Sequence, residues 1–240
     1  MNTAFKQKII ARFGQAVASY DDHAAVQKQA AKRLATFLPA LPVPEFPHIL
    51  EIGCGTGFFT EHLIATYPKA ELFITDISEP MLQICKNRYA GPNRHFSLMD
   101  GEAPDITGPF DLIASSMTFQ WFEDFEGSIE RLKRLLSPQA CILFSTLGAQ
   151  SYIEWKSTLK DLGLPDAVLQ GQRIPEPLAE DIFQTHYDRP VDFLINLKHI
   201  GATASRQEAR LSPSQLRTAL RKCGNKMTYH VVYAADCNRP

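Results

Sequence analysis

The stretch "ILEIGCGTGFFTEHL", residues 49–63, constrains the fold of this chain more than any other. It places three glycines within five residues, directly after an apolar run and directly before a segment with helical periodicity. Glycine adopts positive φ angles easily and lets a backbone approach a ligand without an intervening Cβ. The stretch therefore predicts a strand, a tight ligand-binding turn and a helix.

The spacing of the glycines argues against a pyrophosphate ligand. Gly53, Gly55 and Gly57 lack the third glycine of the dinucleotide fingerprint, because Phe58 occupies that position. No Lys-Ser/Thr pair follows, so the turn is not a P-loop either. We expect a nucleoside ligand of another kind, or a tight turn with no ligand.

The residues after the turn continue as apolar runs that alternate with helical segments. This alternation predicts an α/β fold with a mostly parallel sheet and right-handed connections. Such sheets bind ligands beyond the carboxyl ends of their strands. The expected strands are residues 48–53, 70–76, 94–100, 109–116 and 140–146, and the expected helices are 58–67, 79–89 and 127–136.

The rest of the chain flanks this core as parts of one domain. Residues 1–47 are expected to form N-terminal helices, one of them capped by Asp21 or Asp22, and a linker with four prolines between Pro39 and Pro47. The core spans 48–147. Residues 148–226 predict a largely helical cap that shapes a substrate pocket, and 227–240 a last strand and tail.

An acid supports the choice of a nucleoside ligand. Asp76 ends the second expected strand, at about the 20-residue spacing at which an acid reaches ribose hydroxyls. The set "LEIGCGTG", "FITDIS", "MDGEAPD" and "FDLIASS" resembles the class I S-adenosylmethionine-dependent methyltransferases over positions 48–147. The resemblance implies a Rossmann-like sheet and S-adenosylmethionine as cofactor.

The same resemblance implies roles for individual residues. The glycine turn would pack against the methionine part of the cofactor, Asp76 would hold the ribose diol, Met81 would line the adenine slot, and Asp100 would bind the adenine amine. Met81 could equally be core filler. The full set of expected cofactor residues is Tyr20, Gln27, Glu51, Gly53, Gly55, Gly57, Asp76, Met81, Asp100, Gly101 and Ser115.

Motifs outside the nucleotide-binding core carry a closer resemblance. "ARFGQAVASYDDHAAVQKQAAKRL", "MTFQWFED", "STLG", "LKHIGAT" and "MTYHVVY" are similar to the malonyl-acyl-carrier-protein O-methyltransferases of biotin synthesis over nearly the whole chain. The chain is shorter than the family pattern between Phe183 and Val191, as if a strand-like segment were missing. The resemblance implies methyl transfer to the free carboxylate of a malonyl thioester, with no general base.

The substrate carboxylate would need a cation or hydrogen-bond donors when it leaves water. The expected substrate residues are Tyr20, Gln120, Trp121, Lys198 and Arg210, with Lys156 as a further cation. Ordinary alternatives stand beside each: solvated helix cations for the basic residues, helix packing for Tyr20 and core packing for Trp121. Cys54 is not expected to be a nucleophile, and no histidine is assigned a catalytic role.

Charge and cysteine content bear on partners and compartment. The net charge of −1 gives no reason to expect nucleic acid, and the start of the chain lacks the apolar core of a signal peptide. Five cysteines without a CxxC pair or metal-type cluster predict reduced thiols, no metal and a cytoplasmic protein. No stretch approaches the roughly 20 apolar residues of a membrane span, so none is expected. Residues 196–226 hold one acid and seven basic residues: Lys198, Arg206, Arg210, Arg217, Arg221, Lys222 and Lys226.

That basic patch would attract an acidic acyl carrier protein, or it is simply a solvated helix face. Two other functions remain open from the sequence. One is methyl transfer to another small molecule, such as a quinone, a phenol or another free acid. The other is a cofactor-binding assembly factor without turnover.

Overall fold

The computed structural model describes residues 3–166, 168–204 and 211–238, which fold as two compact units. The core unit comprises Ala25–Thr146, Ile174–Ala179 and Val232–Pro240. The cap unit comprises Met1–Ala24, Leu147–Arg173 and Glu180–Val231. The N-terminal helices are thus divided between the two units at Ala24.

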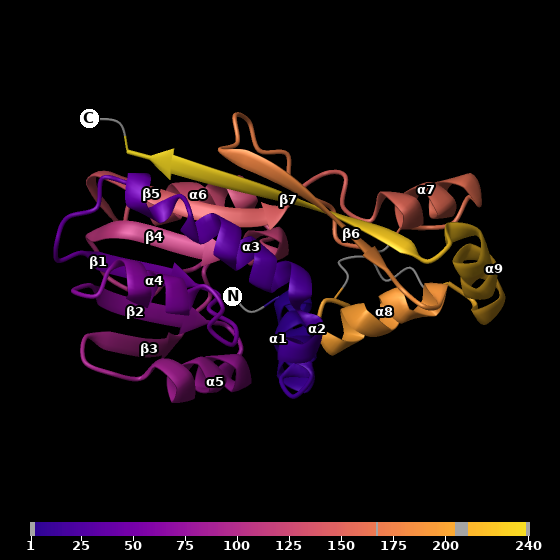
Figure 1. Cartoon of the computed structure of the whole chain (residues 1–240), viewed down its shortest axis with the longest axis horizontal. Coiled ribbons are helices and arrows are strands. Elements are labelled where there is room, and N and C mark those ends of the chain that lie inside the picture. The colour runs from indigo at the N-terminus through magenta and orange to yellow at the C-terminus, as the bar shows by residue number, and fades with distance from the viewer. Residues whose placement is uncertain (1–2, 167, 205–210, 239–240) are drawn as a thin grey trace. The chain divides into compact units, whose positions relative to one another are not determined.

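The core unit contains the predicted alternation of strands and helices. Its chain order is α3 (Ala25–Ala35), η1 (Leu38–Ala40), β1 (His48–Ile52), α4 (Thr60–Thr66), β2 (Glu71–Asp76), α5 (Glu79–Tyr89), β3 (Arg94–Leu98), β4 (Phe110–Ser116), η2 (Phe119–Trp121), α6 (Phe125–Lys133) and β5 (Leu136–Leu147). In Figure 1, α3 and α4 lie in front of the strands of this unit.

Hydrogen bonds join seven strands in the order β3-β2-β1-β4-β5-β7-β6, where β7 is Lys226–Cys237 and β6 is Ala179–His186. The β1–β2, β1–β4, β2–β3 and β4–β5 pairs are parallel. The register sets Ile52 beside Thr75 and Asp76 beside Leu98. The loops that follow the strands therefore meet at one edge, as the α/β prediction requires.

The core forms because the parallel strands are apolar on both faces. Leu50 and Ile52 on β1, Ile113 on β4, and Ile142 and Phe144 on β5 lie in one buried cluster. Phe119 and Phe122 complete it, with stacked rings 4.7 Å apart. These aromatic side chains hold the loop after β4 against the ends of the strands.

The cap unit contains α1 (Ala4–Ala16), α2 (Tyr20–His23), α7 (Ile153–Asp161), α8 (Pro190–His199), α9 (Pro213–Cys223), most of β6 and the first half of β7. Its interior is aromatic: the Tyr152 ring lies 5.6 Å from Phe193 and 5.2 Å from Tyr229. Helix α9 begins with a capping box between Ser212 and Gln215.

One local prediction about these helices was wrong, and one strand was missed. The helix expected from Asp21 or Asp22 to Phe37 is broken at Ala24, whose ψ of 42° ends α2 before α3 begins at Ala25. The cap unit also contains most of β6, residues 179–186, a strand that the sequence analysis did not predict. This strand alternates exposed and half-buried residues at an edge of the sheet, so its apolar signal is weak.

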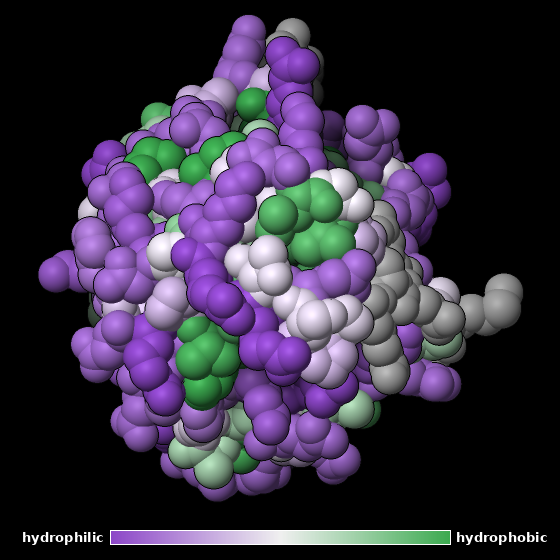
Figure 2. Space-filling model, turned by 90° about the vertical axis from the view of Figure 1, so that its right-hand side faces the viewer, coloured by the Kyte–Doolittle hydropathy of each residue, from purple (hydrophilic) through white to green (hydrophobic). Residues whose placement is uncertain are grey.

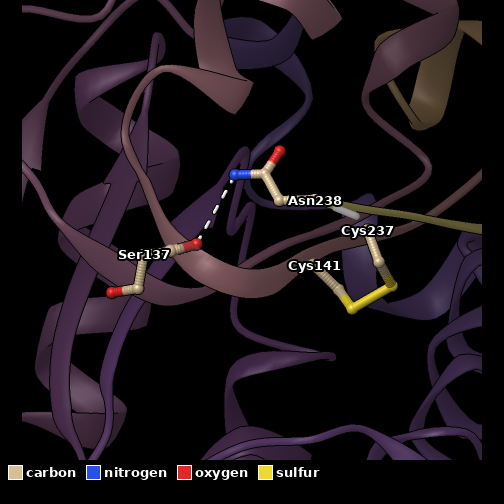
Figure 3. Close-up of a disulfide and its surroundings, with 4 residues drawn as sticks. All are labelled: Ser137, Cys141, Cys237 and Asn238. Atoms are coloured by element: carbon tan, nitrogen blue, oxygen red, sulfur yellow. Dashed lines mark hydrogen bonds between the residues drawn. A yellow bond between two sulfur atoms is a disulfide. The ribbon is translucent and has the colours of Figure 1, made fainter. Parts of the chain in front are cut away.

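The prediction of reduced thiols was also wrong for one cysteine pair. Cys141 on β5 and Cys237 at the end of β7 form a disulfide that closes a separation of 96 residues. Figure 3 shows the bond beside a hydrogen bond from Asn238 to the Ser137 carbonyl. No CxxC motif marks this pair, since the two residues meet only when the strands pair. Cys54, Cys85 and Cys223 remain free.

Among the helices that the structure describes, none is long and apolar enough to cross a membrane.

Candidate functional site

The glycine turn follows β1 and is held by the neighbouring strand. The carbonyl oxygen of Thr75, on β2, accepts hydrogen bonds from the backbone N–H groups of Gly53 and Cys54, both at 2.9 Å. Gly53 and Gly57 have φ angles of 71° and 100°. A side chain at Gly53 would collide with Thr118, so the turn accepts only glycine there. The turn is thus a rigid backbone loop at the carboxyl end of β1.

Gly55 differs from the other two glycines of the turn. Its φ is 56°, and a Cβ built on it would meet no atom within 4 Å. Its N–H donates to Asp76 Oδ2 at 2.8 Å, while the N–H of Ser78 donates to Asp76 Oδ1 at 2.7 Å. The bare backbone therefore faces open space next to a carboxylate, which leaves room for a ligand against the backbone.

Asp76 is a buried acid with a shifted pKa. Burial raises the pKa of Asp76 to about 6, against the lowering effect of the hydrogen bonds from Ser78, Gly55 and Ile77. A carboxylate in this position is stabilised when further donors reach it. The two hydroxyls of a ribose would supply such donors.

Glu51 lies beneath the turn, not at its surface. It is 1 % exposed, and its Oε2 accepts a hydrogen bond from Thr60 Oγ1 at 2.7 Å. Burial raises the pKa of Glu51 well above its usual range. Thr60 also contacts Cys85 Sγ at 3.4 Å, and a hydrogen bond with the Cys54 thiol lowers the pKa of Cys85. This network joins the turn to α4 and α5.

Most of the residues expected near the adenine base lie towards the carboxyl ends of the neighbouring strands β3 and β4. Asp100 is half-buried after β3, and its Oδ1 accepts from the N–H of Glu102 at 3.0 Å. Gly101 is buried, and a Cβ there would lie 2.4 Å from Ile52. Ser115, on β4, donates to the Ile52 carbonyl at 2.9 Å. Met81 is 1 % exposed within α5. The contribution of Met81 to an adenine slot stays a prediction.

Gln120 and Trp121 follow β4 on η2, and both are buried. The Gln120 amide donates to the Met117 carbonyl at 2.6 Å and accepts from Thr146 Oγ1 at 3.3 Å. Met117 itself has a φ of 54°, so the chain turns sharply at the end of β4. Gln120 thus fixes the loop at the end of β4, and contact with a substrate stays a prediction.

The remaining predicted residues are distributed over other elements. Gln27 is half-buried on α3 of the core unit, whereas Tyr20 begins α2 of the cap unit. Lys198 is exposed in the last turn of α8, and Lys156 on α7 is half-buried, which lowers its pKa. Arg210, together with Arg206, lies outside the described residues.

Comparison with known proteins decides the family. Residues 49–139 match a family described as "Methyltransferase domain". A "Malonyl-[acyl-carrier protein] O-methyltransferase" of Magnetococcus marinus is 35% identical over 240 residues, covering 92% of this chain and 88% of the relative. The chain belongs to the malonyl-[acyl-carrier protein] O-methyltransferase family. It is therefore an S-adenosylmethionine-dependent O-methyltransferase.

Other relatives agree with this membership. The "Biotin biosynthesis bifunctional protein BioCD" of Bordetella avium is 36% identical over 241 residues, covering 95% of this chain and 51% of that protein. Among solved structures, the YcgJ protein of Bacillus subtilis superposes with a TM-score of 0.62 at 12% identity, covering 86% of this chain and 98% of the other. At that identity the superposition shows similarity of fold alone.

The site fits S-adenosylmethionine on its own geometry. The open space at Gly55 admits a ligand against the backbone, and Asp76 offers a carboxylate beside it. Asp100 lies at the end of the neighbouring strand. When bound, S-adenosylmethionine supplies an electrophilic methyl group on a positively charged sulfur.

Sequence reasoning missed several residues that build the site. Thr75 and Thr118 hold the turn, and Glu102 fastens the loop after β3. Thr75 directly precedes Asp76, and Glu102 follows Asp100 by two residues, so proximity to the motifs was the available signal. Their partners lie on other elements and are not visible in the local sequence.

Proposed function

We propose that this protein transfers the methyl group of S-adenosylmethionine to the free carboxylate of a malonyl thioester carried by an acyl carrier protein, giving the methyl ester. The observation that carries the proposal is similarity over nearly the full length to a protein of that name. The name of the Bordetella relative supports a place in biotin synthesis.

The chemistry requires no proton transfer from the protein. A carboxylate with an ordinary pKa of about 4 is already ionised at neutral pH. One of its oxygens forms the new bond to the methyl carbon while the bond from carbon to sulfur breaks, leaving a methyl ester and a neutral thioether. The protein must align the reacting atoms and exclude water, so positioning supplies most of the acceleration.

The core unit would position the cofactor. In this proposal Asp76 accepts hydrogen bonds from the ribose, Asp100 accepts from the adenine amine, and the backbone from Gly53 to Gly57 contacts the methionine part. Glu51 supports the turn from below through Thr60. The resemblance to class I methyltransferases implies these assignments, and the positions of the residues at the carboxyl ends of the strands support them.

Candidate acceptor residues occur in both units: Gln120 and Trp121 belong to the core unit, and the others belong to the cap unit. Tyr20, Gln120 and Trp121 are proposed to contact the acyl group. For the carboxylate we propose Lys198 or Lys156. Partial burial, which lowers the pKa of Lys156, suits a cation that receives a desolvated carboxylate, whereas Lys198 is exposed. Measuring the Michaelis constant for the acceptor in Lys156→Ala and in Lys198→Ala would distinguish the two lysines.

We also propose that the carrier protein docks on the basic residues of α8 and α9. On α9, Lys222 is paired with Asp161 at 3.2 Å. Arg217 and Arg221 are exposed, lie one helical turn apart on the same face, and have no ion pair with a described residue. The face in Figure 2 is mostly hydrophilic, with separate small hydrophobic patches. Arg217 and Arg221 are therefore the members best suited to meet acidic side chains.

The test is a methyl-transfer assay on a panel of acceptors, run at a salt concentration close to that of the cytoplasm. Purified protein with S-adenosylmethionine should methylate malonyl-carrier protein faster than malonyl-coenzyme A, and succinyl-carrier protein should react poorly. Replacing Arg217 and Arg221 by glutamine should raise the Michaelis constant for the carrier protein and leave that for the coenzyme A thioester unchanged. Turnover of another free acid instead would favour the alternative small-molecule methyltransferase.

A cytoplasmic location also belongs to this proposal, because its substrate is a carrier-bound intermediate. Detection of the protein in the cytoplasmic fraction of its source cells would test it.

A further inference from the structure

Glu102 joins the loop after β3 to the start of α6. It is 6 % exposed, which is unusual for a glutamate. Its Oε1 accepts a hydrogen bond from the backbone N–H of Asp124 at 2.9 Å and from Ser128 Oγ at 3.3 Å. A buried carboxylate at a helix N-terminus is stabilised by the unpaired N–H groups and the dipole of the helix.

Arg131 strengthens the same junction from one turn further along α6. Its Nε donates to the carbonyl oxygen of Glu102 at 2.8 Å, and its NH2 group donates to Ser128 Oγ at 2.8 Å. Its NH1 group also pairs with Asp124 Oδ2 at 3.1 Å. Both the side chain and the backbone of Glu102 are therefore fixed by α6.

The fixed backbone of Glu102 in turn orients Asp100. The N–H of Glu102 donates to Asp100 Oδ1 at 3.0 Å, and the N–H of Ala103 donates to the Asp100 carbonyl at 2.9 Å. Gly101, between them, packs so closely on Ile52 and Phe122 that a Cβ would have no room. The rotation of the Asp100 carboxylate thus depends on where α6 holds Glu102.

We propose that Glu102 is a positioning residue for recognition of the adenine amine: through its contacts with Asp124 and Ser128 it sets the orientation of the Asp100 carboxylate. This inference rests on the proposed assignment of Asp100 to the adenine amine and adds a specificity role for a residue that does not itself contact the base. It predicts that disturbing Glu102 impairs discrimination between bases more than it impairs binding in general.

The test compares two cofactor products that differ only at the purine. S-adenosylhomocysteine carries the exocyclic amine, and S-inosylhomocysteine carries an oxygen in its place. In isothermal titration calorimetry the wild type should bind the adenosyl compound more tightly. Glu102→Gln, which keeps the shape but loses the charge, should weaken adenosyl binding by about tenfold, the scale of a hydrogen bond to a charged group. The logarithm of the dissociation constant for the inosyl compound should change by less than half as much.

A second variant and a control separate positioning from loss of folding. Ser128→Ala removes one donor to Glu102. It should shift the ratio of the dissociation constants of the adenosyl and inosyl compounds in the same direction by a smaller factor. Glu126→Gln, at an exposed position in the first turn of α6, should leave the ratio unchanged. Thermal unfolding of each variant shows whether it is folded at the titration temperature.

Equal loss of affinity for both compounds in Glu102→Gln would overturn the inference, because a purely structural role predicts it. An unchanged ratio in Ser128→Ala together with an unchanged ratio in Glu102→Gln would also overturn it. These binding measurements do not depend on the acceptor, so they separate this inference from the proposal of malonyl methylation. A wild type that binds neither compound would contradict both.

Discussion

The proposed contact between Asp76 and the ribose predicts that cofactor affinity falls as the pH falls. Burial raises the pKa of the Asp76 carboxyl to about 6 in the protein without cofactor. In the proposed complex the ribose hydroxyls donate to Asp76 and favour the charged carboxylate, so the pKa in the complex should be lower. Below the pKa of the cofactor-free protein, binding must therefore displace a proton from Asp76, and affinity falls as the pH falls.

The size of the effect follows from the same pKa. Each pH unit below about 6 should weaken binding by up to tenfold, or about 1.4 kcal/mol, until the pH reaches the lower pKa of the complex. Above about pH 7 the carboxylate is already ionised, so affinity should be constant. Asp76→Asn should weaken binding at neutral pH and abolish the dependence, because asparagine has no proton to lose.

Calorimetry with S-adenosylhomocysteine over the range from about pH 8 to about pH 5 measures this directly. Repeating the titrations in buffers of different ionisation enthalpy counts the protons released, which should rise towards one as the pH falls below the pKa of Asp76. Asp105→Asn, at an exposed position, serves as the matched control. A flat profile in the wild type, or the same slope in Asp76→Asn, would refute the reasoning.

Three further predictions concern the cysteine pair, the glycine turn and the cap. Reduction of the disulfide, or Cys237→Ser, should lower the free energy of unfolding by up to about 4–5 kcal/mol, because the disulfide closes a long loop. A melting temperature that reductant does not change would contradict this. Gly57→Ala should abolish calorimetric binding of S-adenosylhomocysteine, since its φ is 100° and Tyr89 fills the space, whereas Gly163→Ala should bind normally. His23 and His199 stack at 4.3 Å, so a double-mutant cycle should show a coupling of about 0.5–1.5 kcal/mol in unfolding free energy; additive effects would rule out the contact.

The core of the fold could be predicted from the sequence because its signals are local. Alternating apolar runs and helical segments specify the βα units, and the glycines with Asp76 mark the carboxyl ends of β1 and β2. The family motifs then implied the cofactor. Each of these patterns extends over only about 20 residues, the range over which sequence periodicity is informative.

What the sequence did not indicate depends on contacts between distant segments. β6 lies at a sheet edge and alternates exposed with half-buried residues, so it lacks the apolar run of a buried strand. The disulfide arises only where β5 and β7 meet, 96 residues apart. The break at Ala24 falls inside a helical pattern with no proline or glycine, and the contacts of Glu102 depend on a helix that begins more than 20 residues later.

The central claim is that a malonyl carboxylate receives the methyl group. It is tested most directly by supplying S-adenosylmethionine labelled with carbon-13 in the methyl group to the protein and malonyl-carrier protein, and recording a carbon–proton correlation spectrum of the product. We predict a methyl signal of an ester, coupled through oxygen to the terminal carboxyl carbon and removed by mild alkali, with an equal amount of S-adenosylhomocysteine. A label on carbon or nitrogen, or no transfer by protein that binds S-adenosylhomocysteine normally, would contradict the account.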